Sequence, residues 1–260
     1  MSKECMLDIA IRAVREVGKI LLDGLGDSHD ITVKGVRDIA TEVDLRAEQT
    51  AIEIILEACP QARIVAEESH DEYVEEKDVP TWYIDPLDGT TNYARGMPTF
   101  SCSVAMVEEG KVQCGAVYDP QLDHLFYAQR GEGSFLNGQR LHVSAQDTLM
   151  ESILLLDWPR DQSYRKQSAR FLCKLVPRVG TVRSRGSAAL SFCYVAVGWA
   201  DVYYQFTLYP WDVAAGLLIV EEAGGTVTNL RGEAYDLHGL DWLASNGLLH
   251  EDVLAFEPYG

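Results

Sequence analysis

The sequence predicts a mixed α/β and α+β protein, in which an α+β half precedes an α/β half. Residues 100–143 have the pattern of β-hairpins, with the turn dipeptides Gly110-Lys111 and Asn137-Gly138 between apolar runs. After about residue 150, short apolar runs alternate with stretches of helical periodicity, which is typical of βα units. We place the boundary between residues 1–148 and 149–260, although no change in composition marks it.

The expected elements follow in order along the chain. Apolar residues at helical spacing predict helices over residues 7–22 and 41–58. Short apolar runs that end in acids predict strands over residues 62–69 and 81–86, and the hairpins come next. In the second half we expect strands at 152–158, 178–184, 201–206 and 224–230, and helices at 164–176, 187–198 and 212–223.

The charge and composition of the chain limit which classes of partner it can bind. The 260 residues include 40 acidic and 22 basic side chains, for a net charge of −18. A surface this acidic repels phosphate backbones, so we expect no nucleic-acid partner, and an anionic substrate needs cations at its site. The six cysteines are scattered without a C-x-x-C pair, and we find no signal peptide or apolar run long enough for a membrane span. We therefore expect a cytoplasmic protein with reduced thiols and no membrane partner.

Two aspartates follow the apolar run Trp-Tyr-Ile at residues 82–84. In a continuing strand Asp85 and Asp88 would lie roughly 10 Å apart and point to opposite faces. Pro86 and Gly89 instead favour a turn, which would bring the carboxylates together beside the Leu87 carbonyl. Carboxylate and carbonyl oxygens are the hard ligands that Mg²⁺ prefers, although an ordinary surface turn has the same composition.

The residues behind these acids are suited to a phosphate. Gly89, Thr90 and Thr91 offer backbone N–H groups and hydroxyls directly after the second aspartate. A helix that begins here would point its N-terminus at an anion. The stretch therefore predicts a metal site with a phosphate site beside it.

Four further acids lie at or near the ends of other predicted strands and helices. Glu67 and Glu68 end a second apolar strand, Asp212 precedes an apolar helix, and Asp44 lies one turn into the second helix. Each also has a purely structural interpretation, namely a solvated strand end, an N-cap, and a capping-box partner of Thr41. If the acids converge, each pair about 4 Å apart repels by about 4 kcal/mol at an effective dielectric near 20. Such a cluster requires raised pKa values or divalent cations.

Several segments resemble the inositol monophosphatase family. Residues 82–98, WYIDPLDGTTNYARGMP, are similar to its first signature, and residues 211–225, WDVAAGLLIVEEAGG, to its second. The resemblance covers nearly the whole chain and implies a layered αβαβα sandwich of the sugar-phosphatase type. It also implies a homodimer that requires Mg²⁺ and is inhibited by Li⁺. Shorter matches occur in order at DIATEVD (38–44), AEES (66–69), AVYDP (116–120), GSFLNGQRL (133–141) and RGSAAL (185–190).

The same resemblance implies two to three bound Mg²⁺ ions. The ligands would be Glu67, Asp85, the Leu87 carbonyl, Asp88 and Asp212. The substrate contacts would fall on Asp88, Gly89, Thr90, Ala188 and Asp212. The implied chemistry is hydrolysis of a phosphate monoester by a metal-activated water. We expect Asp44, Glu67 and Thr90 to take part in activating that water, with Glu68 in a supporting position.

The chain departs from the family at the substrate end. Many inositol phosphatases carry a glutamate where this chain has Gln205, which keeps the length but loses the charge. Arg160 or Arg165 is a candidate for binding a second anionic group, and Arg183 and Arg185 are further candidates.

Three functions follow from this. The first is hydrolysis of a small sugar or cyclitol phosphate, with inositol 1-phosphate preferred. The second is the activity of a fructose-1,6-bisphosphatase, a 3′(2′),5′-bisphosphate nucleotidase or a histidinol-phosphatase. The third is a protein-binding scaffold, which the full set of metal-site acids argues against.

Overall fold

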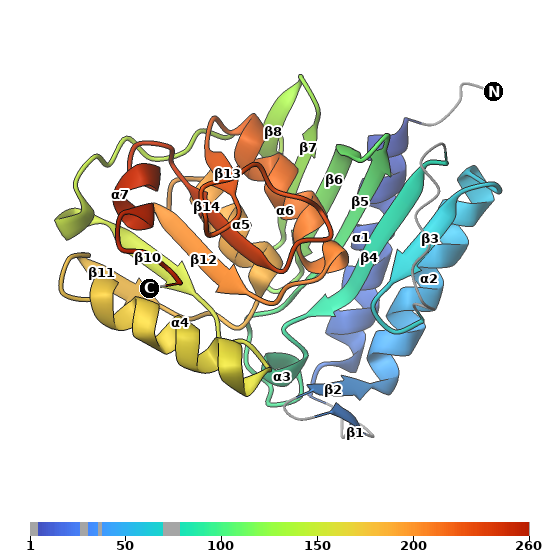
Figure 1. Cartoon of the computed structure of the whole chain (residues 1–260). Coiled ribbons are helices and arrows are strands. Elements are labelled where there is room, and N and C mark those ends of the chain that lie inside the picture. The colour runs from blue at the N-terminus through green and yellow to red at the C-terminus, as the bar shows by residue number, and fades with distance from the viewer. Residues whose placement is uncertain (1–4, 27–30, 36–37, 70–78, 260) are drawn as a thin grey trace.

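Two β-sheets lie between three layers of helices, and the five layers give an αβαβα sandwich (Figure 1). The computed structural model describes residues 5–26, 31–35, 38–69 and 79–259, with the backbone alone for residues 31–41. This architecture confirms the predicted fold class. None of the helices in these ranges combines the length and the apolarity needed to span a bilayer.

The first layer consists of α1 (Met6–Gly24) and α2 (Glu42–Ala58), close to the two predicted helices. Their apolar stripes pack on one face of the larger sheet, because α1 contacts β5 and β6 and α2 contacts β4. A two-stranded ribbon, β1 (Ile31–Gly35) and β2 (Asp38–Thr41), joins these helices and was not predicted.

The larger sheet has seven strands in the order β3-β4-β5-β6-β7-β8-β9. Only the β3–β4 pair is parallel, so the sheet is mostly a series of hairpins, as the sequence predicts. Asn137 and Gly138 both have positive φ at the β8–β9 turn, which is the conformation that an Asn-Gly hairpin requires. The strands are β3 (Arg63–Ala66), β4 (Thr81–Asp88), β5 (Ser101–Glu108), β6 (Lys111–Asp119), β7 (His124–Gln129), β8 (Gly133–Leu136) and β9 (Gln139–Arg140).

The middle layer consists of α5 (Ala188–Ala196) and α6 (Pro210–Glu222). Both helices are apolar on nearly every side, because each packs between the two sheets. Small residues permit this close approach: a Cβ at Gly115 of β6 would lie 2.8 Å from the Cα of Ala215.

The smaller sheet has the strand order β11-β10-β12-β14-β13, and its outer face is covered by α4 (Gln162–Leu175) and α7 (His250–Leu254) (Figure 1). The strand β14 was not predicted, and neither was α7. Along β12, Tyr204 faces the outer helices, whereas Tyr203 faces the middle layer. The strands are β10 (Ile153–Leu156), β11 (Thr181–Arg183), β12 (Val202–Phe206), β13 (Thr226–Thr228) and β14 (Asp241–Ser245).

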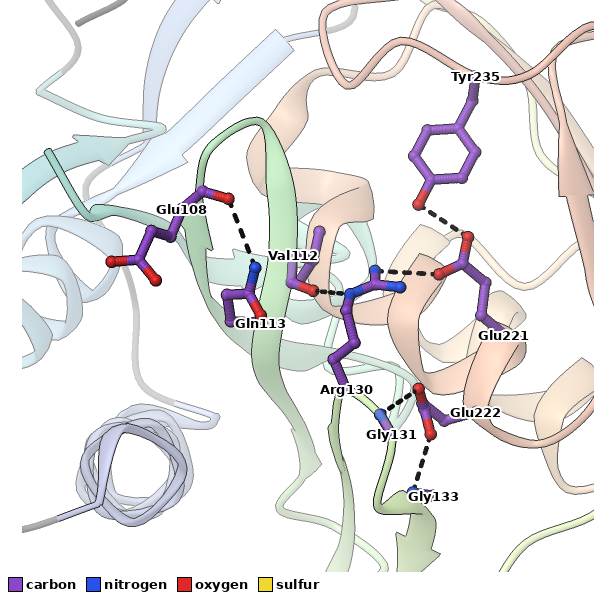
Figure 2. A network of polar contacts seen from close by, with 9 residues as sticks. All are labelled: Glu108, Val112, Gln113, Arg130, Gly131, Gly133, Glu221, Glu222 and Tyr235. Carbon is purple, nitrogen blue, oxygen red and sulfur yellow. Dashed lines mark hydrogen bonds and ion pairs between the residues drawn. The ribbon is translucent and has the colours of Figure 1, made fainter. Parts of the chain in front are cut away.

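Two glutamates at the end of α6 fix this helix to the rest of the fold (Figure 2). Glu221 accepts from Arg130 Nη2 at 3.1 Å and from the Tyr235 hydroxyl at 2.9 Å. Glu222 accepts from the backbone N–H groups of Gly131 and Gly133, both at 2.8 Å. Acids at a helix C-terminus are unfavourable for the helix dipole, and these bonds offset that cost. These bonds hold the C-terminal end of α6, whereas the candidate site residue Asp212 lies in its first turn.

Candidate active site

A β-bulge in β4 brings the two signature aspartates to one face of the sheet. Asp85 is paired with Ser103 of β5 and Asp88 with Ser101, so three steps along β4 match two steps along β5. The extra residue reverses the alternation, and both aspartates therefore point the same way. The predicted turn is thus wrong in detail: the strand continues to Asp88, and Pro86 lies within the bulge, where it need not donate to the ladder.

The bulge lies beside a cleft of about 930 Å³ between the two sheets. Most of the predicted site residues line this cleft. They are Glu67, Asp85, Leu87, Asp88, Gly89, Thr90, Ala188, Gln205 and Asp212. Asp44 and Arg185 are not among the lining residues.

The acids come from three elements and lie close enough to repel one another. Burial raises the pKa of Asp85 well above its usual range, and the neighbouring Glu67 carboxylate is the next cause. Asp88 and Asp212 raise it further. Burial likewise raises the pKa of Asp212, with Glu67 again the largest charge effect. Glu67 is therefore part of the cluster rather than a solvated strand end.

Asp88 connects the bulge to the start of α5. Its carboxylate accepts from Ser187 Oγ at 2.5 Å and from the backbone N–H groups of Ala188 at 3.1 Å and Ala189 at 2.8 Å. Burial raises the pKa of Asp88 to about 6, although these hydrogen bonds lower it. Ala188 thus contributes to the site through its backbone.

Asp212 lies in the first turn of α6. Its Oδ2 accepts from the backbone N–H of Tyr209 at 2.7 Å. The N-cap is Tyr209 and Pro210 begins the helix, so Asp212 occupies the third helical position and not the N-cap that we considered. From this position Asp212 lines the cleft together with Asp85 and Asp88 of β4.

Thr90 lies between the bulge and α2. Its hydroxyl lies 3.0 Å from the Leu87 carbonyl and 3.5 Å from Asp44 Oδ1. The shorter contact is the stronger one, so the hydroxyl donates mainly to Leu87. Asp44 is fully buried in the first turn of α2, whereas the side chain of its suggested capping partner Thr41 lies outside the described residues.

A short helix, α3 (Thr90–Tyr93), begins behind the aspartates, as expected for a phosphate site. Gly89 is its N-cap with φ +96°, and a Cβ there would lie 3.0 Å from the carbonyl oxygen of Gly186. Glycine is therefore required both by the backbone and by the close packing.

The donor set fits a hard divalent cation. Within the described ranges, no three Asp, Glu, His or Cys side chains form a ready-made ion site. Asp88 and Asp212 each accept from backbone N–H groups. The oxygen ligands are nevertheless the type that Mg²⁺ prefers. Burial raises the pKa values of Asp85 and Asp212, and repulsion from neighbouring carboxylates is a further cause. A divalent cation would relieve that repulsion.

Two predicted substrate residues differ in their surroundings. Gln205 is 4% exposed on β12, and within the described chain its Oε1 has no hydrogen-bond partner. The Arg185 guanidinium instead lies over the Tyr194 ring at 3.8 Å and donates to its hydroxyl at 2.8 Å. Arg185 therefore reaches the region of the site only through its backbone, whose carbonyl accepts from Asn92.

Asp157 is a site residue that we did not predict. It follows β10, lines the cleft, and accepts from Ser184 Oγ and from the backbone N–H groups of Arg185 and Gly186. Ser191 Oγ donates to its other oxygen at 3.3 Å. The signal was available, because Asp157 directly follows the apolar run of residues 153–156, as Asp85 follows that of residues 82–84.

Glu48 and Asn92 were also missed. Glu48 is buried in α2 and accepts from the backbone N–H of Glu68 at 2.7 Å, which holds the end of β3. Asn92 donates to the carbonyls of Thr99 and Arg185, both at 2.8 Å. In the sequence, a single polar residue on a helix does not indicate that it makes a long-range hydrogen bond of this kind.

Comparisons with known proteins find relatives along nearly the whole chain. A family model described as "Inositol monophosphatase family" matches residues 2–256. A Thermotoga maritima protein named "Fructose-1,6-bisphosphatase/inositol-1-monophosphatase" is 38% identical over 249 residues, which are 95% of this chain and 94% of that protein. The Escherichia coli K12 protein named "Nus factor SuhB" is 40% identical over 230 residues, 87% of this chain and 86% of the relative.

A solved structure extends the likeness to three dimensions. The extragenic suppressor protein suhB from Bartonella henselae has a TM-score of 0.93 and 30% identity, covering 99% of this chain and 100% of that one. The chain belongs to the inositol monophosphatase family.

Proposed function

We propose that this protein is a Mg²⁺-dependent phosphatase of small sugar or cyclitol phosphates, with inositol 1-phosphate as the first substrate to test. The observation that carries the proposal is the bulge in β4, which aims Asp85 and Asp88 into one cleft with Glu67 and Asp212. Membership in a phosphatase family supports the same reaction class.

The ligands proposed for two to three Mg²⁺ ions are Glu67, Asp85, the Leu87 carbonyl, Asp88 and Asp212. Bound there, the ions would neutralise the phosphate oxygens and supply a nucleophilic water at neutral pH. The chain's own contribution is to hold five oxygen ligands, from β4, α6 and the turn after β3, at one end of a cleft.

The phosphate would lie against the start of α3. Gly89 and Thr90 present backbone N–H groups there, and the tight packing of Gly89 on Gly186 fixes their direction. The Thr90 hydroxyl is proposed to orient the attacking water, with Leu87 and Asp44 as the acceptors that orient the hydroxyl. The substrate hydroxyls would meet Asp88, the Ala188 backbone, Gln205 and Asp212. A homodimer, inhibition by Li⁺ and a cytoplasmic location are proposed with this assignment.

The test is phosphate release with Mg²⁺ from a panel of inositol 1-phosphate, fructose 1,6-bisphosphate, adenosine 3′,5′-bisphosphate and histidinol phosphate. We expect release from at least one sugar or cyclitol ester, and its loss with excess EDTA. Turnover that persists without divalent cations, or a phosphoenzyme trapped from the native protein, would contradict the proposal. An Asp44→Asn variant with unchanged turnover would remove Asp44 from it.

The name "Nus factor SuhB" carried by relatives at 38–40% identity favours a second candidate, a protein-binding role on the same fold. The same panel separates the two candidates. No phosphate release from any ester in the panel would favour the binding role.

A further inference from the structure

The connection between β11 and α5 lies between two buried aspartates. We call residues 184–189 the α5 entry segment; it ends with the first two residues of α5. Asp157, which directly follows β10, bonds the first half of this segment, and Asp88 of β4 bonds the second half. Asp88 is a proposed metal ligand, whereas Asp157 is not among the proposed ligands.

One carboxylate oxygen of Asp157 collects the donors at the start of the segment. Its Oδ1 accepts from the Ser184 hydroxyl at 3.0 Å. The same oxygen accepts from the backbone N–H groups of Arg185 at 2.9 Å and Gly186 at 2.6 Å. Asp157 is only 8% exposed, so water competes little for these donors. Two consecutive N–H groups aimed at one carboxylate oxygen fix the backbone in both position and direction.

The second half of the segment fixes both oxygens of Asp88. Its Oδ1 accepts from the backbone N–H of Ala188 at 3.1 Å, and its Oδ2 accepts from that of Ala189 at 2.8 Å. Ser187 is the N-cap of α5, and its hydroxyl donates to Oδ2 at 2.5 Å. Hydrogen bonds of this kind orient a ligand toward its cation. The direction in which Asp88 offers its remaining lone pairs therefore depends on where the α5 entry segment lies.

Gly186 links Asp157 to the phosphate side of the cleft. Its N–H is bonded to Asp157, and its carbonyl oxygen would lie 3.0 Å from a Cβ placed on Gly89, the N-cap of α3. The carbonyl of Arg185 accepts from Asn92 of α3 at 2.8 Å. A shift of the segment would therefore also move the start of α3, where the phosphate is proposed to lie.

Asp201 shows the same chemistry at a place remote from the cleft. It is 5% exposed and accepts from a serine hydroxyl, that of Ser144, and from the backbone N–H of Ile153 at 2.6 Å. Ile153 begins β10, whereas Asp157 follows its last residue. Asp201 is not among the residues that line the cleft, so it is a matched example of a buried aspartate that only holds the fold.

We propose that Asp157 is a positioning residue: through the α5 entry segment it fixes the orientation of Asp88 toward the metal ions and the position of Gly89 beside the phosphate. This inference rests on the proposed function and extends it to a residue that holds neither the ions nor the reacting atoms. The hydrogen bonds of Asp157, and not its charge, produce the effect.

The experiment measures the binding of Mn²⁺ to the protein without substrate, because Mn²⁺ suits the same oxygen ligands as Mg²⁺. The EPR signal of free Mn²⁺ gives the dissociation constant. Asp157→Ala should raise this constant about tenfold, the lower end of what the loss of a supporting contact costs a metal site. The Mg²⁺ concentration for half-maximal phosphate release should rise by a similar factor. Asp157→Asn keeps an acceptor oxygen for the segment and should stay within about threefold of the unaltered protein.

The matched control is Asp201→Ala. It should lower the midpoint of thermal unfolding, as Asp157→Ala does, but leave the Mn²⁺ dissociation constant within about twofold. If both variants weaken Mn²⁺ binding equally, Asp157 acts through general stability and the inference fails. If Asp157→Ala does not fold, Ser184→Ala decides, because it removes one donor to Asp157 at an exposed position. That variant should raise the constant about threefold, and an unchanged constant would overturn the inference.

The remaining outcomes are also decisive. Equal losses with Asp157→Ala and Asp157→Asn would assign the effect to the charge of Asp157 and overturn the positioning role. Unchanged Mn²⁺ binding by a folded Asp157→Ala variant would overturn it too, while phosphate release by the unaltered protein would keep the proposed function. If the unaltered protein binds Mn²⁺ but releases no phosphate, the proposed function is refuted, and the Mn²⁺ measurements still decide whether Asp157 positions Asp88. Failure of the unaltered protein to bind Mn²⁺ would refute both.

Discussion

The carboxylate end of the cleft (Glu67, Asp85, Asp88 and Asp212) and its α4 wall (residues 157–165) differ in charge, burial and support. Asp85 and Asp88 are buried, Asp212 is half-buried, and all three lie on regular elements, with pKa values that burial raises. Arg160 and Trp158 of the wall are exposed, and Arg165 is partly exposed. The carboxylate end combines residues of β4, of α6 and of the segment after β3. The wall is held by local bonds within residues 157–165 and by the bonds of Asp157 to residues 184–191.

Under the proposed function, the carboxylate end would set the chemistry and the wall would set the substrate. Buried acids on a sheet and a helix tolerate little change, because each carboxylate depends on several others. An exposed connecting segment can change its side chains without disturbing the core. Substitutions at the carboxylate end should therefore abolish turnover, and those in the wall should change which ester is hydrolysed.

The largest effect is expected from Asp85→Asn. This change removes the most buried charge among the proposed metal ligands and should lower kcat on the order of 10³-fold. In the metal-free protein the same change should raise the stability of the fold, because it relieves repulsion with Glu67, Asp88 and Asp212. The midpoint of thermal unfolding in EDTA should rise by roughly 2–4 °C for each kcal/mol relieved.

The exposed Asp147→Asn variant is the matched control and should change neither quantity. A fall in the metal-free unfolding midpoint of Asp85→Asn would show that the carboxylate stabilises the fold. That result would argue against the interpretation of this end as a cluster of repelling acids.

The Asp157→Asn variant tests the first residue of the α4 wall through the pH dependence of protein stability. Burial raises the pKa of Asp157 from 3.8 to about 6, so the folded protein keeps this proton longer than the unfolded chain does as pH rises. As pH rises from about 4 to about 6, the free energy of unfolding therefore falls, by at most about 3 kcal/mol from this group. The asparagine variant should lose less stability over that range, as measured by urea unfolding at pH 4.5 and pH 7.

The variant keeps an acceptor oxygen for the N–H groups of Arg185 and Gly186, so its fold should be preserved. Equal pH dependence of the two proteins would contradict the argument. In that case Asp157 would be ionised in both the folded and the unfolded state across the whole range.

The carboxylate end was largely predictable from the sequence, but the way in which the chain builds it was not. Apolar strands ending in acids identified Glu67, Asp85 and Asp88, and the second signature identified Asp212. The bulge was not foreseen, because it depends on the register of β4 against β5, which no local pattern in residues 81–88 records.

The missed elements have a similar cause. The strand β14 (Asp241–Ser245) is only five residues long and lies inside its sheet between β12 and β13, so tertiary pairing determines it. Asp157 gave a local signal, but its function depends on donors at residues 184–191. Contacts between residues distant in the sequence are thus what sequence reasoning could not supply.

A smaller effect than that of Asp85→Asn is expected at Thr90. Thr90→Val keeps the shape but removes the hydroxyl, and should lower kcat about 10²-fold because the attacking water loses its orienting group. Thr90→Ser keeps the hydroxyl within reach of the Leu87 carbonyl and should retain activity within about tenfold. Equal activity of the two variants in a phosphate-release assay would exclude the hydroxyl from the reaction.

The smallest effect is expected from Gln205→Glu, which changes the side chain between the carboxylate end and the α4 wall. The added carboxylate accepts strongly from substrate hydroxyls but repels a second phosphate, so the two substrate classes should respond oppositely. We expect the ratio of kcat/KM for inositol 1-phosphate to that for fructose 1,6-bisphosphate to rise about tenfold. Gln113→Glu, a change at a partly exposed position of β6 outside the cleft, controls for the added charge. If the ratio in Gln205→Glu stays within twofold of the unaltered protein, the orphaned oxygen of Gln205 does not contact the substrate, and selectivity must come from the arginines alone.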